Sequence, residues 1–137
     1  MNCIIIDDEK ISRVILKTLC DKTNLNVINE FSNAIEAIKY LNKHEVDVVF
    51  LDYHMPSFNG LDFIKTINKP INIILTTSDP KFAIEAFEYD FIIDYLLKPI
   101  EISRFKKSIS KVTNKLVSPT DVTKQPQINK VFYINVD

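Results

Sequence analysis

Glycine is almost missing from this sequence: its 137 residues include one glycine, and tryptophan is absent. An average protein contains roughly 7% glycine. The backbone loops that cradle phosphate groups in dinucleotide-binding folds and in nucleoside triphosphatases need more than one glycine at fixed spacing. No such loop can be written here, and the sequence therefore argues against both kinds of nucleotide site.

Long apolar runs and surplus charge are missing as well. No apolar run approaches the ~18 residues that cross a membrane, and Asp7, Asp8 and Glu9 interrupt the first apolar run before it could act as a signal segment. The net charge of −1 gives no bulk attraction to nucleic acid or to a membrane surface. The two cysteines, Cys3 and Cys20, lie in apolar patterns, which predicts buried thiols in a reduced, cytoplasmic protein.

What is present suits one globular domain with a short appendage. Hydrophobic residues make up 46% of the chain and charged residues 26%, and this length buries a core without disulfides or metal. Short β-rich runs predict strands at about 3–6, 25–31, 46–51, 71–75 and 91–97. Helical spacing of apolar residues predicts helices at about 9–20, 34–43, 61–67, 80–89 and 101–116, the first capped by Asp8. The alternation predicts an α/β fold, a doubly wound five-stranded parallel sheet with five helices.

The end of the chain has a different character. The basic residues of 101–117 are expected on the solvated face of the last helix; they are Arg104, Lys106, Lys107, Lys111 and Lys115. Residues 118–127 are polar with two prolines and predict a linker. Residues 128–137 are strand-like, with no element after them to pair with.

Polar side chains follow the apolar runs at one edge of the predicted sheet. Asp7 and Asp8 follow the first strand, Asp52 ends the third, Thr77 follows the fourth and Lys98 follows the fifth. Ligands of such sheets bind at the carboxyl ends of the strands. Three carboxylates gathered there repel one another, and Mg²⁺, which prefers oxygen ligands, relieves the repulsion. Together with a lysine and a hydroxyl the set would cradle phosphoryl oxygens, with Asp52 as the nucleophile that becomes an aspartyl phosphate.

Four segments then resemble the receiver domain of two-component response regulators: IIIDDE at 4–9, VVFLDYHMPSFNG at 48–60, ILTTS at 74–78 and DYLLKPI at 94–100. The resemblance covers residues 1–117 and implies the flavodoxin-like receiver fold. It also implies a sensor histidine kinase as the phosphoryl donor. The protein would catalyse only its own phosphorylation and dephosphorylation, and would not be an enzyme in the ordinary sense.

The same resemblance implies a role for each site residue. Asp52 would be the phosphoacceptor, and Mg²⁺ would be held by Asp7, Asp8, Asp52 and the backbone carbonyl of His54. Asp8 would bind the metal directly and Asp7 largely through water. Thr77 would be the switch hydroxyl, Tyr95 the switch aromatic and Lys98 the phosphate-binding lysine, with a cis bond before Pro99.

Residues 76–100, the segment RFKKSI at 104–109 and the tail NKVFYINVD at 129–137 resemble receivers that precede a LytTR-type DNA-binding domain. The implied organisation is a receiver at 1–117, a linker at 118–127 and the start of a truncated output domain at 128–137. Phosphorylation would switch the face formed by the predicted helix at 80–89, the strand at 91–97 and the helix at 101–116, favour a homodimer and control transcription. DNA would be bound only through the missing output domain.

Three other interpretations stay in view. A pseudo-receiver would be an interaction module without phosphorylation, which the intact set of acids, threonine and lysine disfavours. A phosphatase of the haloacid-dehalogenase type would carry its nucleophile after the first strand, with a second Asp two residues on, whereas Asp7 and Asp8 are adjacent. A flavodoxin-like cofactor binder would need a loop rich in hydroxyls and glycine after that strand, where DDEKIS would repel phosphate.

Overall fold

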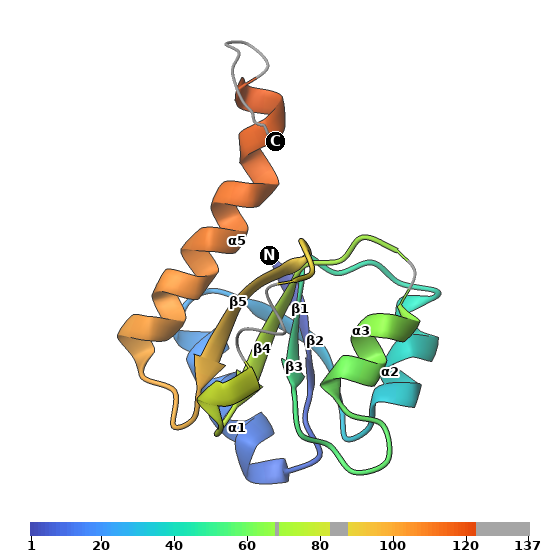
Figure 1. Ribbon diagram of the computed structural model, residues 1–137. Helices are drawn as coiled ribbons and strands as arrows, with labels where there is room; N and C mark the ends of the chain where they lie inside the picture. Colours follow the sequence, from blue (N-terminus) through green and yellow to red (C-terminus); the bar gives the residue numbers. More distant parts are fainter. Residues whose placement is uncertain (68, 83–87, 123–137) are drawn as a thin grey trace.

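The computed structural model describes residues 1–67, 69–82 and 88–122, with 68, 83–87 and 123–137 outside the described part (Figure 1). Within it, five parallel strands form one sheet in the order β2-β1-β3-β4-β5. The strands are β1 (Asn2–Ile6), β2 (Asn26–Phe31), β3 (Val48–Asp52), β4 (Ile73–Thr77) and β5 (Ile92–Leu97). The helices are α1 (Lys10–Lys22), α2 (Ala34–Leu41), α3 (Gly60–Thr66), the short 3₁₀ helix η1 (Pro80–Phe82) and α5 (Ile102–Val122).

The helices cover both faces of the sheet, which explains the unbroken apolar runs of the central strands. Figure 1 shows α2 and α3 on one face and α1 and α5 on the other. The first face buries a core around Phe63, Leu41 and Ile4. The second buries Leu16 and Phe50, with the ring of Phe50 stacked on Phe105 of α5 at 5.4 Å between centroids. The predicted α/β fold is confirmed.

Three predicted segments either differ from the structure or lie partly or wholly outside the described residues. The predicted helix at 80–89 is seen as η1 at its start, and residues 83–87 lie outside the described residues. Helix α5 continues to Val122, into the stretch expected to be a linker. A polar composition predicts exposure rather than a non-helical backbone, and adding residues to a formed helix is easier than starting one. The strand-like segment 128–137 also lies outside the described residues.

The beginning of α1 corrects a detail of the sequence analysis. The residue at the N-cap position is Glu9, which makes no side-chain cap bond, and the expectation that Asp8 caps the helix is wrong. The carboxylate of Asp7 instead accepts a hydrogen bond from the Glu9 backbone N–H at 2.9 Å. The Asp8 side chain lies near Asp7 and Asp52 at the edge of the sheet.

Part of the apolar pattern that predicts α1, formed by Ile11, Val14 and Ile15, does not pack on the sheet. Leu16, Leu19 and Cys20 are buried, whereas Ile11 is 68% exposed and Val14 and Ile15 about half exposed, at 51% and 47%. When a helix has apolar residues on two faces, the periodicity predicts the helix but does not say which face packs on the sheet. The surplus apolar face is therefore on the surface of the molecule.

The cysteines and the lengths of the helices can both be compared with the predictions. Cys3 and Cys20 are free and buried, with their Sγ atoms 3.9 Å apart, so the prediction of two buried thiols is confirmed. The hydrogen bond with Cys3 and burial raise the pKa of the Cys20 thiol. Among the described residues, none of the helices combines the length and apolarity needed to span a membrane.

The single glycine occupies a position where a side chain has no room. A Cβ atom at Gly60 would lie 2.8 Å from the Tyr53 Cα and 3.2 Å from the Asp52 carbonyl oxygen. The Gly60 N–H donates to the Tyr53 carbonyl at 2.9 Å, and a capping box between Asn59 and Asp62 starts α3 beside it. The end of β3, which carries Asp52, is thus held against the beginning of α3.

Gly60→Ala is expected to lower the free energy of unfolding by about 1–3 kcal/mol, because the added methyl overlaps backbone atoms that cannot rotate away. Urea unfolding of the variant and the parent measures the difference. Lys65→Ala, an exposed change on the same helix, serves as the control and should stay within about 0.5 kcal/mol of the parent. Equal stabilities for Gly60→Ala and Lys65→Ala would contradict the close-approach argument.

Candidate functional site

The polar residues predicted to meet at the carboxyl edge of the sheet do lie together. Asp7 and Asp8 follow β1, Asp52 ends β3 and Lys98 follows β5. Strand β3 pairs directly with β1, which brings the first two acids next to the third. One carboxylate oxygen from each of Asp7, Asp8 and Asp52 lies within 4.8 Å of the others.

Asp7 is the fixed member of this cluster. Its side chain is fully buried, and its Oδ2 accepts a hydrogen bond from the Lys98 Nζ at 3.0 Å. Its backbone is tied as well, since its N–H donates to the Phe31 carbonyl at 3.0 Å and its carbonyl accepts from Arg13 at 2.7 Å. Asp8, by contrast, is exposed. The cluster therefore has a rigid inner acid and an outer acid that faces solvent.

Asp52 is the third acid of the cluster and also lies beside the lysine. It is 4% exposed, with the Lys98 Nζ at 3.6 Å and the His54 backbone N–H donating to its Oδ1 at 3.4 Å. Burial and the negative charge of Asp7 raise the pKa of Asp52 to about 7, with a smaller contribution from Asp8, although Lys98 and the His54 N–H oppose the rise. Without a cation, the carboxyl therefore titrates near neutrality.

Lys98 is held at three points. Its Nζ contacts Asp7, Asp52 and, at 3.4 Å, the Ser12 hydroxyl of α1. Burial alone would lower the pKa of Lys98, but the hydrogen bond to Asp7 and the charges of Asp52 and Asp7 outweigh it and raise that pKa. The Lys98–Pro99 bond is cis, as the resemblance implies.

The charges of the site leave room for a divalent cation. Three ionised carboxylates and one ammonium sum to two negative charges, and the carboxylate oxygens are the hard donors that Mg²⁺ prefers. The pKa of Asp52 is raised first by burial and then by the charge of Asp7, which is part of this imbalance. The donor set thus fits a divalent metal ion held by Asp7, Asp8 and Asp52.

Thr77 and Tyr95, the two residues predicted to act as a switch, make their contacts outside the acidic cluster. The Thr77 hydroxyl, 3% exposed, accepts a hydrogen bond from the Asp79 N–H at 3.0 Å and lies 3.3 Å from the Asp79 carbonyl. Tyr95 is half-buried and packs against the core on the α2–α3 face of the sheet. The Thr77 hydroxyl is therefore bonded to the backbone of Asp79, in the loop that follows β4, and not to the acids.

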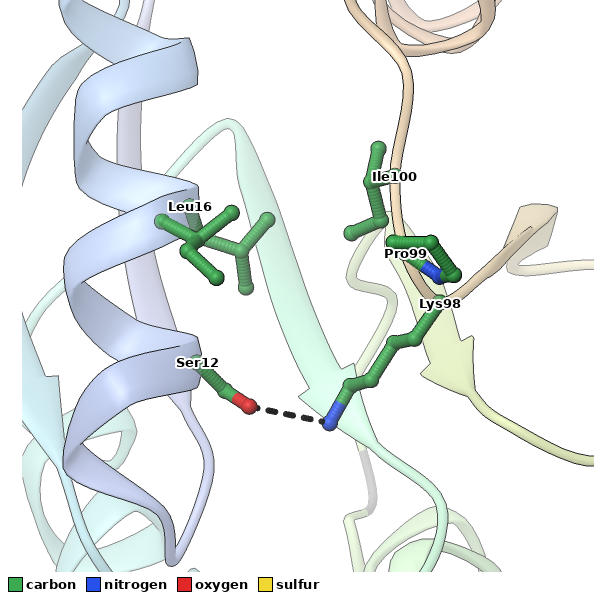
Figure 2. A pocket seen from close by; sticks show the side chains of 6 residues that line it. Ser12, Leu16, Lys98, Pro99 and Ile100 are labelled. Atoms are coloured by element: carbon green, nitrogen blue, oxygen red, sulfur yellow. Dashed lines mark hydrogen bonds between the residues drawn. The ribbon is translucent and has the colours of Figure 1, made fainter.

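Sequence reasoning missed a groove beside the site. Figure 2 shows Leu16 and Ser12 of α1 facing Lys98, Pro99 and Ile100, with Ser12 bonded to Lys98. The groove has a volume of about 520 Å³, and Ile15 also lines it. The available signal in the sequence was that α1 carries apolar residues, Ile15 and Leu16 among them, on more than one face.

Sequence reasoning also missed an ion pair between a buried acid and a half-buried arginine. Asp94 of β5 is bonded to Arg104 of α5, although the basic residues of that helix were expected to be solvated. That expectation holds for Lys106, Lys107, Lys111 and Lys115, which are exposed, but not for Arg104, which is half-buried. A charged residue inside the apolar run of β5 was the signal for a buried partner.

In sequence, the chain is similar to bacterial signalling proteins. The pattern of the response regulator receiver domain matches residues 3–110. The chain is 35% identical over 126 residues to the sensory transduction protein LytR of Staphylococcus haemolyticus, covering 89% of this chain and 49% of that protein. It is also 35% identical over 128 residues to the transcriptional regulatory protein BtsR of Escherichia coli, covering 90% and 52%. The chain spans about half the length of the curated relatives it matches.

In structure, it is similar to isolated receiver domains. The response regulatory domain of protein mrkE from Klebsiella pneumoniae superposes with a TM-score of 0.75 at 29% identity, covering 84% of this chain and 97% of that one. The receiver domain of AraT, a response regulator from Geobacillus stearothermophilus, gives a TM-score of 0.73 at 33% identity, covering 84% and 94%.

The stability of the metal-free protein is expected to fall by on the order of 5 °C in melting temperature between pH 5 and pH 8. The pKa of Asp52 is raised by folding, so the protonated carboxyl stabilises the native state at low pH, and this stability is lost as the pH rises through about 7. Mg²⁺ should restore more stability at pH 8 than at pH 5, because protons compete for the same oxygens.

Thermal melts with and without Mg²⁺ across this pH range test the expectation. Asp52→Asn should flatten the pH dependence, while Glu36→Gln, an exposed change on α2, should leave it as in the parent. A parent whose metal-free melting temperature rises from pH 5 to pH 8 would show that Asp52 does not titrate as described.

Proposed function

The chain belongs to the response regulator receiver family, and on that premise we propose that it is a phosphoacceptor switch in which Asp52 takes a phosphoryl group from a sensor histidine kinase. One observation carries the proposal: Asp52 is a nearly buried carboxylate that faces an ammonium group and two further acids at the open edge of the sheet. This arrangement offers an oxygen nucleophile, a fixed positive charge and a metal donor set together.

In the proposed reaction, a carboxylate oxygen of Asp52 attacks the phosphorus of a phosphohistidine. The new P–O bond forms as the P–N bond of the donor breaks, and the electron pair of that bond returns to the imidazole nitrogen. Lys98, already 3.6 Å from Asp52, would pair with a phosphoryl oxygen and hold its charge. Mg²⁺ bound by Asp7, Asp8, Asp52 and the His54 carbonyl would supply the positive charge that offsets these acids and the phosphoryl oxygens.

The switch is proposed to start at Thr77. Its hydroxyl is held by the Asp79 backbone, so reaching a phosphoryl group on Asp52 requires it to exchange those bonds for a stronger, charge-assisted one. That exchange is a differential contact between two states, which coupling requires. Tyr95, half-buried beside the same edge, would respond to the space that Thr77 leaves.

The downstream role is proposed from the relatives. The proteins named LytR and BtsR are described as sensory transduction and transcriptional regulatory proteins. We expect this receiver to act in transcription through a LytTR-type output domain, with DNA contacts made by that domain and not by the receiver. A homodimer formed on phosphorylation through the predicted helix at 80–89, β5 and α5 stays a prediction, because residues 83–87 of that face lie outside the described residues.

The kinase is proposed to dock on the exposed apolar face of α1. Ile11, Val14 and Ile15 are surplus to the core, and Ile15 lines the groove that ends at Lys98. A donor histidine must come within bonding distance of Asp52 while its protein rests on an adjacent surface. An apolar patch next to the acceptor meets that need.

Incubation with acetyl phosphate and Mg²⁺, followed by intact-mass measurement, tests the central proposal. The parent should gain one phosphoryl group, and the gain should vanish without Mg²⁺ or in Asp52→Asn, which keeps the side-chain shape. Asp21→Asn, an exposed change on α1, should label like the parent. A folded parent that never gains the group would favour the pseudo-receiver interpretation.

Ile11→Glu and Ile15→Glu are expected to slow phosphoryl transfer from a histidine kinase that labels the parent by about tenfold or more, because they place charge in an apolar contact. Labelling by acetyl phosphate should change by less than about twofold, since the small donor needs no docking surface. Ile35→Glu on α2, where the isoleucine is 51% exposed, is the matched control and should leave both rates unchanged. Equal slowing with both donors would place the defect in the acidic site instead of in docking.

A further inference from the structure

Asp94 is the buried charge that the reaction described above does not use. It lies on β5, next to Tyr95 and four residues before Lys98, and is 1% exposed. Its carboxylate accepts hydrogen bonds from Arg104 and, at 2.5 Å, from the Ser108 hydroxyl, both on α5. A carboxylate this far from solvent stays ionised only when such donors surround it.

Arg104 binds the strand with both ends of its guanidinium group. Its Nη1 donates to Asp94 Oδ2 at 2.7 Å and to Ser108 Oγ at 3.1 Å. Its Nη2 donates to Asp94 Oδ1 at 2.8 Å and to the backbone carbonyl of Tyr95 at 3.0 Å. The planar fork thus spans a side chain and the next peptide group of β5, a geometry that a lysine cannot reproduce.

These contacts fall at an irregularity of the sheet. Along the β4–β5 pair, Ile73 lies opposite Ile92 and Ile74 opposite Asp94, so Ile93 is an extra residue in β5. Ile93 and Asp94 consequently face the same side, toward α1 and α5. This is a β-bulge, and the Tyr95 N–H is bonded to the Asp94 carboxylate at 2.9 Å beside it.

The bulge decides where every later residue of the strand points. After it, Leu96 faces the α1–α5 side and Tyr95 the α2–α3 side. The register continues to Lys98, whose N–H donates to the Thr77 carbonyl at 2.7 Å and whose Nζ reaches Ser12 of α1. Pairing without the extra residue would exchange the two faces from Asp94 onward and turn Lys98 away from Asp7.

The cluster has the electrostatic signature of a tight clamp. Burial by itself would raise the pKa of Asp94, but the hydrogen bonds from Arg104, Ser108 and the Tyr95 N–H outweigh it and lower that pKa to about 2. Lys111 also approaches the same carboxylate, at 3.3 Å, yet its side chain is half exposed. Among these cations, Arg104 is the one that also holds the strand backbone.

We propose that Arg104 is a positioning residue of the phosphoacceptor site: by clamping Asp94 and the Tyr95 carbonyl it fixes the bulged register of β5 and thereby places Lys98 against Asp7 and Asp52. The inference rests on the proposed function, since the quantity it affects is phosphoryl transfer to Asp52. It gives α5 an indirect role in phosphoryl transfer, in which Arg104 acts through β5 and does not itself touch the reacting atoms.

A double-mutant cycle with Lys98 tests this role. Labelling rates with acetyl phosphate at saturating Mg²⁺ are measured for the parent, Arg104→Met, Lys98→Ala and the double variant. Because displacing a catalytic group by about an ångström costs up to ~100-fold, Arg104→Met should slow the parent about tenfold. In the Lys98→Ala background the same change should slow labelling less than about twofold, because there is no lysine left to position.

Two further variants separate the clamp from simple charge. Lys111→Met removes the other cation beside the Asp94 carboxylate but leaves the bond between Arg104 and the β5 backbone in place, and should leave the labelling rate unchanged. Arg104→Lys restores charge without the fork, and should recover only part of the rate. Ser108→Ala, which withdraws one donor while leaving Asp94 paired, should give a smaller slowing of about two- to threefold that again depends on Lys98, even if Arg104→Met folds poorly.

Equal slowing by Arg104→Met or by Ser108→Ala in both backgrounds would overturn the positioning role and leave a merely structural one. Full recovery by Arg104→Lys would overturn the claim that the fork sets the register. Failure of the underlying function looks different: the parent itself would gain no phosphoryl group, or would gain it after Asp52→Asn.

Discussion

The contact of one ammonium group with two carboxylates is the interaction on which this molecule's organisation depends. Lys98 meets Asp7 and Asp52 although 91 residues separate the first pair in sequence. The meeting requires β1, β3, β4 and β5 to be parallel neighbours, so that their ends fall on one edge. The three carboxylates and the ammonium group together carry a net charge of two negative units, and this charge favours the binding of a cation at the edge, beside a phosphoryl group.

The positions of these residues could be predicted from sequence because parallel topology converts an order along the chain into a place in space. A polar residue that follows an apolar run falls at the carboxyl edge, whatever the details of packing. Asp7, Asp52 and Lys98 were found in this way, and their proximity is confirmed. The identity of the single glycine is understandable only from the fold, since the backbone atoms it approaches belong to the last residue of β3 and to the residue after it.

Other features depend on information that periodicity does not contain. The apolar residues of α1 mark a helix, but the choice between Ile11 and Leu16 as the packed side is made by the sheet beneath. Arg104 looks like one basic residue among several on α5. Its partner becomes visible only once the extra residue Ile93 turns Asp94 toward that helix, and a bulge leaves no mark on an apolar run.

Helix α5 has a mechanical consequence. Its 21 residues span about 30 Å. The helix is attached to the rest of the molecule from Arg104 through the buried Val112 to Lys115, while Figure 1 shows its last turns reaching beyond the sheet. The helix is therefore a lever: if it tilted as one body by about 5° about Arg104, Val122, about 27 Å away along the axis, would move by about 2.4 Å. Movements of the strand too small to remodel a surface would therefore arrive magnified at Val122.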